Sequence, residues 1–500
     1  MVDVQMLPQE LLAPLSASEV EAPPHQVERT DVGCDHLDQF FTQKKSLAAQ
    51  YSDLYFMRLQ TLKPDVAAVA AEKWKGNPAE KWKGRDLEDA AEKWKGTGAV
   101  HVDRILEIPV GQRCFVVGTI YKEMSLKPNI LTDITNKDGA PVEAMRKNFV
   151  DAADYAIIED DSGRITLDLS AEGVPACGEV VTGLVIAMLG TCMEDTGVFT
   201  VEEVCYSGLA EQPPAGEQAK GASILLVSGL QLGDADGDPL AVEMLVDYVT
   251  GNLGGKEDHS EAANIVKVII AGGSCYRSPD LPPAPGHRKP DAKAVAEQHK
   301  ERAAPVRELD ILLTRLSASV AVDVMPGDGD PTNAFLPQQP FHACLLPSAG
   351  TYSTFRAATN PYAAVMGKDK EAGDGNGVLV VGSSGQNVDD VMRYSTLTDA
   401  VDVLDLMLNW RHLAPTAPDT LPCFPTKTED PFVLSRCPHV FFAGNQVAFG
   451  SRALKGPAGQ KAVVISVPCF ATTATAVLVN LETLAAQPLV FSPEAFSAQP

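Results

Sequence analysis

The sequence lacks any long uninterrupted apolar stretch. None of its 500 residues lies in a run of the roughly eighteen apolar residues that a membrane span needs. The first residues are acidic and contain proline, so they also lack the basic and then apolar layout of a signal peptide. We therefore expect a soluble, intracellular protein without a membrane partner.

The residues that usually build metal and nucleophile sites are present but scattered. Ten cysteines form no C-x-x-C pair, nine histidines form no H-x-H or H-x-x-x-H pair, and there is no G-x-S-x-G motif. Zinc ribbons, disulfide frameworks, zinc hydrolases and serine hydrolases therefore have no support from the sequence. We expect reduced and mostly buried thiols.

Positive charge is in short supply. Lysine and arginine number 41 against 66 acidic residues, which gives a formal net charge of −25 and a pI near 4.7. Affinity for nucleic acid comes mainly from basic side chains that neutralise phosphates. A large DNA-binding surface on this chain alone is therefore excluded, and contact with DNA is expected mainly through a partner.

The N-terminal region divides into two predicted segments. Residues 1–35 are rich in proline and acidic residues and predict a disordered tail. In the segment 36–100, apolar residues recur at helical spacing from Leu37 to Leu62, which predicts one amphipathic helix that Pro64 ends.

Three copies of AEKWKG follow, at residues 71–76, 79–84 and 91–96. Their Trp and Lys side chains could stack on bases and neutralise phosphates. Their short length and unequal spacing instead favour a duplication of one helix end.

Two further domains follow in the sequence. Residues 101–212 contain five short β-type runs, and the turn Glu159–Arg164 resembles the first hairpin of an OB-fold barrel. After a Pro/Gly linker, residues 220–500 alternate apolar runs with helical segments, which predicts an α/β domain with buried strands. The five apolar runs are 224–227, 266–271, 319–325, 378–381 and 440–443.

The loops after these five buried strands resemble, in order and flanking glycines, the loops of calcineurin-like metallophosphoesterases and of archaeal small polymerase subunits. Such enzymes use His and carboxylate ligands to hold two metal ions. By this resemblance the ligand positions of the first two loops fall on Gly229, Gln231 and Gly273. Those of the last three loops fall on Asp328 and Gly329, on Ser384, and on Asn445 and Val447. Only Asp328 would bind a metal well, so the resemblance implies a site without catalytic residues, metal or cofactor.

Longer stretches are similar to the delta-type second subunits of eukaryotic replicative DNA polymerases. They are 316–319, 322–327, 330–333, 336–340, 359–362, 384–388 and 412–421, and the resemblance covers roughly residues 36–485. It implies an OB-fold barrel joined to a degenerate calcineurin-like phosphoesterase sandwich with flanking helices, in a nuclear scaffold subunit for replication and repair.

The same resemblance implies the partners of this chain. They are a third polymerase subunit and the C-terminal cysteine-rich module of a catalytic subunit, and this module would carry the iron–sulfur cluster. Two alternatives stay open at this point. The chain could be an active manganese-dependent phosphodiesterase or exonuclease, or a second subunit of the alpha or epsilon type.

One short motif resembles a different binding peptide. His36–Phe41 resembles the peptide that binds the sliding clamp, with Leu37, Phe40 and Phe41 as the residues that would fill the clamp pocket. The Gln expected at the start of that peptide is Cys34 here. Paired phenylalanines are more often part of a hydrophobic core, which is the competing interpretation.

Overall fold

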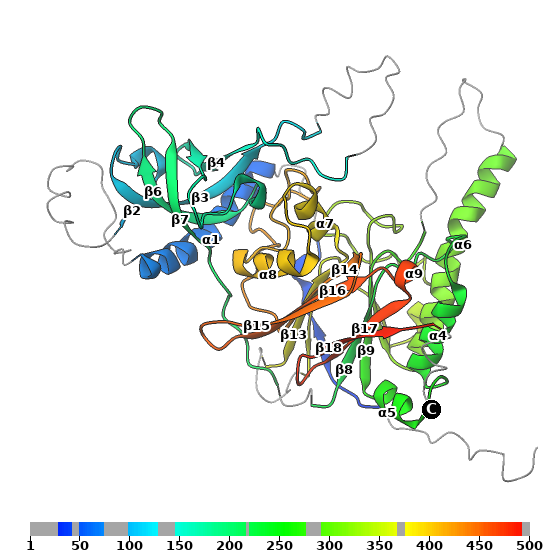
Figure 1. Cartoon of the computed structure of the whole chain (residues 1–500). Coiled ribbons are helices and arrows are strands. Elements are labelled where there is room, and N and C mark those ends of the chain that lie inside the picture. The colour runs from blue at the N-terminus through cyan, green and yellow to red at the C-terminus, as the bar shows by residue number, and fades with distance from the viewer. Residues whose placement is uncertain are drawn as a thin grey trace, which may run out of the picture.

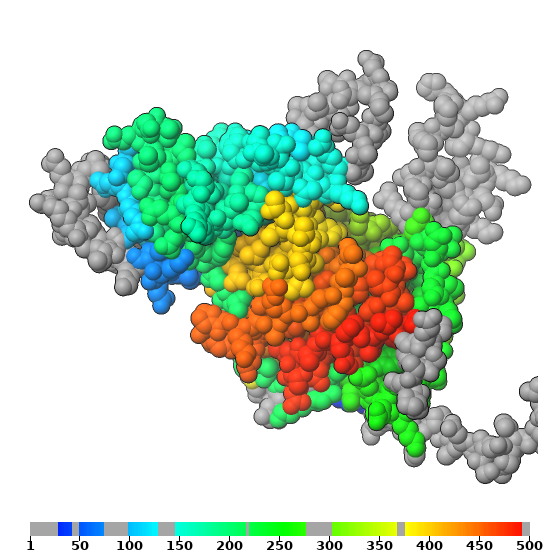
Figure 2. Space-filling model, in the orientation of Figure 1, coloured from blue at the N-terminus to red at the C-terminus, as the bar shows by residue number. Residues whose placement is uncertain are grey.

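The computed structural model describes residues 29–42, 50–74, 99–128, 146–216, 220–276, 292–367 and 376–492. A β-barrel and a larger two-sheet unit lie side by side, with helices between and beside them (Figures 1 and 2). Among the described helices, none combines the length and the apolar character that crossing a bilayer requires.

The barrel contains the five strands that the β-type runs predicted, with ends that differ from the prediction by at most five residues, and one further short strand. Its strand order is β2-β3-β4-β5-β7-β6, and pairing between β3 and β6 closes it. Buried side chains such as Val116, Ile158 and Ile186 fill the interior. The elements are β2 (Val100–Val102), η3 (Ile105–Glu107), β3 (Arg113–Glu123), β4 (Tyr155–Glu159), β5 (Arg164–Asp168), η4 (Cys177–Glu179), β6 (Val185–Cys192) and β7 (Phe199–Cys205).

Helix α1 (Tyr51–Lys73) covers the outside of the barrel and corrects the helix prediction. A short 3₁₀ turn, η2 (Asp38–Phe40), precedes it, and α1 continues through Pro64 to the start of the first AEKWKG copy. Pro64 is exposed, whereas Leu62 and Val66 beside it are buried against the barrel, so packing outweighs the proline penalty.

The described residues of the first repeat copy, 71–74, form the end of α1. This position is compatible with the duplication hypothesis, which stays a prediction. Trp74 caps α1, lies 5.4 Å from Phe115 between ring centroids and donates to Glu203 Oε2. The other two copies, like residues 1–28, lie outside the described residues.

Two six-stranded sheets form the larger unit and share one apolar core. One sheet has the order β1-β12-β13-β14-β16-β15, and the other has the order β11-β10-β9-β8-β17-β18. Residues from both, including Ile269, Val380 and Phe442, pack in one buried cluster. The strands are β1 (Cys34–His36), β8 (Ser223–Val227), β9 (Ile265–Ala271), β10 (Ala321–Met325), β11 (Phe355–Ala357), β12 (Tyr362–Met366), β13 (Val378–Ser383), β14 (Val440–Gln446), β15 (Gly450–Lys455), β16 (Lys461–Pro468), β17 (Thr475–Asn480) and β18 (Ala486–Val490).

Helices lie on the outer faces of this sandwich. On one side α4 and α6 contact each other and α6 contacts β10, while on the other α8 contacts β14, β15 and β16 (Figure 1). The helices are α4 (Pro239–Thr250), α5 (Lys256–Ala263), α6 (Ala292–Ser317), η6 (Ala349–Thr351), α7 (Gln386–Arg393), α8 (Ala400–Trp410) and α9 (Phe470–Thr473).

The N-terminal part of the chain belongs to the sandwich, so the boundary drawn after residue 35 falls inside a strand. Strand β1 pairs antiparallel with β12, with Cys34 opposite Met366 and His36 opposite Ala364. Upstream, Thr30 N donates to Ala263 O at 3.1 Å. A three-residue strand flanked by polar residues gives too little periodicity to be recognised in the sequence.

Arg58 of α1 joins the helix, the barrel and the sandwich. Its guanidinium is fully buried and donates to Asp430 Oδ2 at 2.8 Å, to Gly183 O at 3.1 Å, and to the carbonyl oxygens of Pro415 and Ala417. His412 Nε2 reaches the same Asp430 oxygen at 2.8 Å. One arginine therefore satisfies four acceptors that come from different parts of the chain.

Candidate functional site

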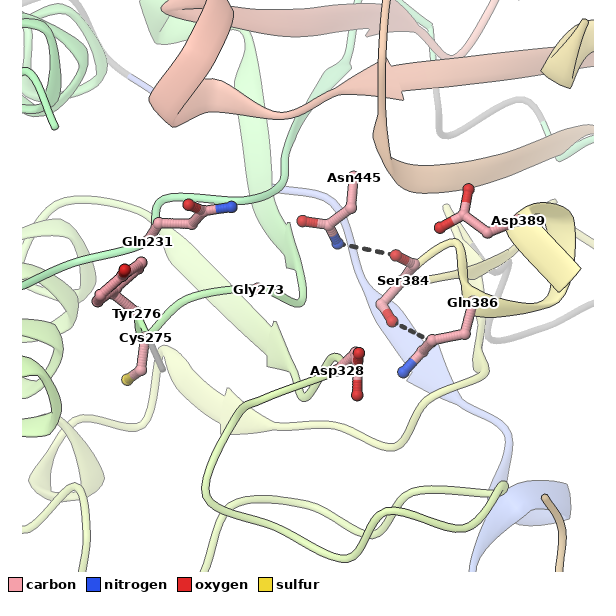
Figure 3. Close-up of a pocket in the computed structure, with 9 residues that line it drawn as sticks. All are labelled: Gln231, Gly273, Cys275, Tyr276, Asp328, Ser384, Gln386, Asp389 and Asn445. Atoms are coloured by element: carbon pink, nitrogen blue, oxygen red, sulfur yellow. Dashed lines mark hydrogen bonds between the residues drawn. The ribbon is translucent and has the colours of Figure 1, made fainter. Parts of the chain in front are cut away.

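A pocket of about 290 Å³ opens where the loops that follow several strands of both sheets come together (Figure 3). This is the edge at which α/β folds commonly bind ligands. The Gln231 and Tyr276 side chains lie at one side of the pocket and Asp389 at the other, with Asn445 and Asp328 between them. The lining residues are Gln231, Gly273, Cys275, Tyr276, Asp328, Ser384, Gln386, Asp389 and Asn445.

The structure brings together most of the positions that the sequence singled out. Gln231, Gly273, Asp328, Ser384 and Asn445 all line the pocket. Gly229 lies beside this group, since a Cβ on it would be 2.8 Å from Asn445 Oδ1. Gly329 follows Asp328 in the same loop but does not line the pocket.

Val447 is the predicted position that lies apart from the others. It is 93% exposed and does not line the pocket, because β14 ends at Gln446 and the chain turns outward there.

Sequence reasoning missed four lining residues, which are Cys275, Tyr276, Gln386 and Asp389. Gln386 and Asp389 belong to a loop and helix start that follow a predicted strand, so their position was a usable signal. Cys275 and Tyr276 lie beyond the glycines of the second loop, and no pattern in the sequence points to them.

Asn445 fills the centre of the site with a fixed amide. Its Nδ2 donates to Ser384 O at 2.8 Å and to Ala271 O at 3.2 Å, and its backbone N donates to Ser228 Oγ at 2.8 Å. Because carbonyl oxygens only accept, these contacts fix the amide orientation and leave Oδ1 facing the glycines.

A network of neutral side chains occupies the fourth loop. Asn360 Nδ2 donates to Ser384 Oγ and Gln386 Oε1, each at 2.9 Å, and to Gln338 Oε1 at 2.7 Å. Ser384 Oγ also donates to Gln386 Oε1. These neutral side chains satisfy one another's hydrogen bonds, so none of them requires a bound ion.

The two glycines of the first two loops leave no room for a side chain. Gly229 and Gly273 both have a φ of +65°, in the left-handed region that favours glycine. A Cβ on Gly273 would lie 2.3 Å from Asn445 Oδ1 and 3.1 Å from Gly229 Cα. A carboxylate at either position therefore conflicts with the backbone and with Asn445.

We expect Gly273→Asp to destabilise the protein without creating a metal site. A side chain at this left-handed backbone position costs about 1–2 kcal/mol of stability. Displacement of Asn445 adds to this cost, because its hydrogen bonds contribute about 1 kcal/mol each. Gly173→Asp is the matched control, because Gly173 has a φ of +83° and open space where the side chain would go. Thermal unfolding and manganese titration of both variants check this; equal unfolding midpoints, or manganese bound only by Gly273→Asp, would contradict it.

The carboxylates of these loops differ in their surroundings. Asp330 is buried and accepts from the backbone N–H groups of Gly327, Gly273, Ser274 and Cys275, so it holds these loops together. Burial raises the pKa of Asp330, and these backbone donors oppose that rise. Asp328 is exposed and makes no hydrogen bond or ion pair with described residues.

Asp389 also faces the pocket and has one weak partner. Its Oδ1 accepts from Gln446 Nε2 at 3.2 Å. Burial raises the pKa of Asp389. The hydrogen bond from Gln446 and the charge of Arg393 oppose this rise, and the charges of Asp390 and Asp328 add to it.

Only one group of His, Cys, Asp and Glu donors within the described residues is close enough to hold a metal, and it lies elsewhere. Cys34, His36 and Asp323 lie within 4.8 Å of one another between the sheets. The Lys267 ammonium, however, lies 2.9 Å from both carboxylate oxygens of Asp323, and Tyr362 OH donates to one of them at 2.7 Å. These residues fit a buried ion pair rather than a metal centre.

The motif that resembles a clamp-binding peptide is largely part of the core. Phe40 is 1% exposed and packs in the cluster that also contains barrel residues, and Leu37 packs against the same cluster. Phe41 alone is partly exposed, at 36%. A clamp pocket needs both aromatic rings, so this placement argues against the clamp interpretation and for the core interpretation.

Comparisons with known proteins agree with this architecture. Residues 224–451 match the family model that describes the B subunits of DNA polymerases alpha and epsilon, and residues 50–204 match the model of the OB-fold domain of DNA polymerase delta subunits. The barrel is therefore an OB-fold domain, and barrel and sandwich together define a B-type polymerase subunit.

Curated relatives narrow the assignment. The DNA polymerase delta small subunit of Oryza sativa is 36% identical over 469 residues, which cover 93% of this chain and 99% of the relative. DNA polymerase delta subunit 2 of Drosophila melanogaster is 33% identical, with 93% and 99% covered. The small subunit of Saccharomyces cerevisiae is 30% identical, with 90% and 91% covered. The chain belongs to the family of DNA polymerase delta small subunits.

Proposed function

We propose that this chain is a non-catalytic accessory subunit of a DNA polymerase delta complex in replication and repair synthesis, where it bridges the catalytic and third subunits. The observation that carries the proposal is the similarity to delta small subunits over more than nine-tenths of the chain. The alpha and epsilon alternatives lose support because these curated relatives are of the delta type.

The pocket supports the absence of catalysis by this chain. We interpret it as a phosphoesterase site of the calcineurin type whose ligands have been replaced. Glycines at 229 and 273, and amide or hydroxyl groups at 231, 384 and 445, stand where charged ligands would be needed. Two metal ions require several oxygen or nitrogen ligands arranged around each ion. The exonuclease alternative would need ligands from outside these loops.

The rest of the molecule suits a scaffold. Arg58 fixes the barrel and the sandwich relative to each other through four buried hydrogen bonds, so partners would meet one rigid surface. The resemblance implies that these partners are the cysteine-rich C-terminal module of the catalytic subunit, with its iron–sulfur cluster, and the third subunit. The acidic charge favours contact with DNA through the complex, which we place in the nucleus.

Co-expression with the C-terminal module of a delta catalytic subunit tests the proposal. We expect a stable one-to-one complex by size exclusion with mass measurement, and no complex with the corresponding alpha or epsilon modules. Elution of chain and module as two separate peaks would contradict the proposal. Phosphodiesterase activity and manganese content of the pure chain, both expected at background, test the enzyme alternative.

A further inference from the structure

Most of the polar side-chain atoms left over in the pocket are hydrogen-bond acceptors. Both amide N–H groups of Asn445 donate to carbonyl oxygens, and one N–H of Gln386 donates to Gln338 Oε1 at 2.9 Å. Gln231 Nε2 donates to Cys469 Sγ at 3.5 Å. Apart from the Tyr276 hydroxyl and the second N–H of Gln231 and of Gln386, the side-chain groups open to a ligand in this pocket accept hydrogen bonds, so a ligand rich in donors is favoured.

The acceptors that remain converge on the hollow and carry negative charge. No hydrogen bond is made with described residues by Gln231 Oε1, Asn445 Oδ1, either Asp328 oxygen or Asp389 Oδ2. None of the nine lining residues is basic. Asp328 and Asp389 form no ion pair with any described residue, although the charge of Arg393, which does not line the pocket, acts on Asp389. The pocket is therefore complementary to a cation.

The volume of the pocket and its aromatic wall indicate which kind of cation fits. The pocket volume of about 290 Å³ lies just below the range of roughly 300–1,000 Å³ typical of small-molecule sites, so the pocket suits one side chain better than a cofactor. Tyr276, which is 37% exposed, provides an aromatic wall. A planar guanidinium uses both features, because it stacks on aromatic rings and pairs with a carboxylate through two parallel hydrogen bonds.

We propose that this pocket receives an arginine side chain from a partner subunit, with Asp328 as its carboxylate and Tyr276 and Asn445 Oδ1 as further contacts. The inference that the arginine belongs to a partner subunit rests on the proposed scaffold function. The pocket would thus have kept its preference for positive charge while the charge it binds changed from metal ions to a protein side chain.

Binding of a model compound to the whole chain tests the pocket by itself. We expect N-acetyl-arginine amide to bind saturably in isothermal titration and in ligand-observed NMR. The neutral isostere N-acetyl-citrulline amide should not bind, and N-acetyl-lysine amide should bind more weakly. Asp328→Asn should weaken arginine binding about tenfold, because it removes the charge but keeps the size.

Asp195→Asn is the matched control. It makes the same change in net charge at an exposed turn of the barrel, and it should leave binding unchanged. Equal affinity of the Asp328→Asn and Asp195→Asn variants would show only diffuse attraction to an acidic surface and would overturn the proposal. Tight binding of Ca²⁺ or Mn²⁺ that arginine amide fails to displace would overturn it as well.

The same variants separate this inference from the proposed function. In the complex with the catalytic module or the third subunit, Asp328→Asn should weaken association about tenfold relative to Asp195→Asn with one of the two partners. If Asp328→Asn and Asp195→Asn bind both partners with equal affinity, the proposal that a partner arginine enters the pocket is wrong, while the scaffold function is still supported. Failure of the unmodified chain to form any complex would overturn the scaffold function, while the arginine amide titration would still report on the pocket.

Discussion

Replacing Arg58 with methionine is expected to destabilise the protein by about 3–5 kcal/mol, the range for removing one partner from a buried ion pair. Methionine fills much of the space, but Asp430 loses its ion-pair partner, and the carbonyl oxygens of Gly183, Pro415 and Ala417 lose their donor. The variant should unfold at lower temperature, with barrel and sandwich as two separate calorimetric transitions.

Two comparisons make this result specific. Arg452→Met removes exposed pairs with Asp402 and Asp405 and should cost less than about 1 kcal/mol. Arg58→Met combined with Asp430→Leu should be less destabilised than the sum of the two single variants, because no unpaired charge stays buried. A single unfolding transition at the original midpoint in Arg58→Met would show that this junction is not what couples the two units.

Acid is expected to destabilise the protein as the pH falls from about 6.5 to 4, through two buried histidines. Burial lowers the pKa of His412 to about 4, with Arg58 as the second cause, and burial lowers the pKa of His439 to about 4. Each is neutral when folded and takes up a proton more easily when unfolded. Their contribution is therefore complete above pH 6.5 and declines by roughly 3 kcal/mol each as the pH approaches 4.

The His439→Gln variant isolates half of this effect. His439 Nδ1 accepts from Leu379 N at 3.0 Å, and glutamine can accept there without titrating. The unfolding midpoint of the variant should fall less steeply between pH 6.5 and 4 than that of the original protein. His342→Gln, which makes the same substitution at an exposed position, is the matched control. Parallel curves for the original protein and His439→Gln would contradict the assignment.

The sequence predicted the parts of the fold that repeat a local pattern. Runs such as 224–227 and 378–381 became buried strands because each is apolar throughout and lies between turn residues. Pro64 misled the helix prediction because the apolar face on both of its sides packs on the barrel, which a local rule does not take into account.

Contacts between distant segments could not be predicted in the same way. In the sequence Arg58 is one more charge on an amphipathic helix, and its partners are between 125 and 372 residues away in the chain. In the pocket, the resemblance placed Asp328 and Asn445, but Cys275 and Tyr276 enter only once the loops have folded together.

Strand β1 has a consequence for the order in which the chain folds during synthesis. The residues that complete one sheet edge, Cys34–His36, leave the ribosome more than 300 residues before their partner strand, Tyr362–Met366. Until then the early segment has no partner strand, whereas most of the barrel is local and can form first. A step of assembly that can occur only after β12 has been made therefore joins the beginning of the chain to its later part. A chain shortened at its N-terminus would present the edge of β12 to other molecules.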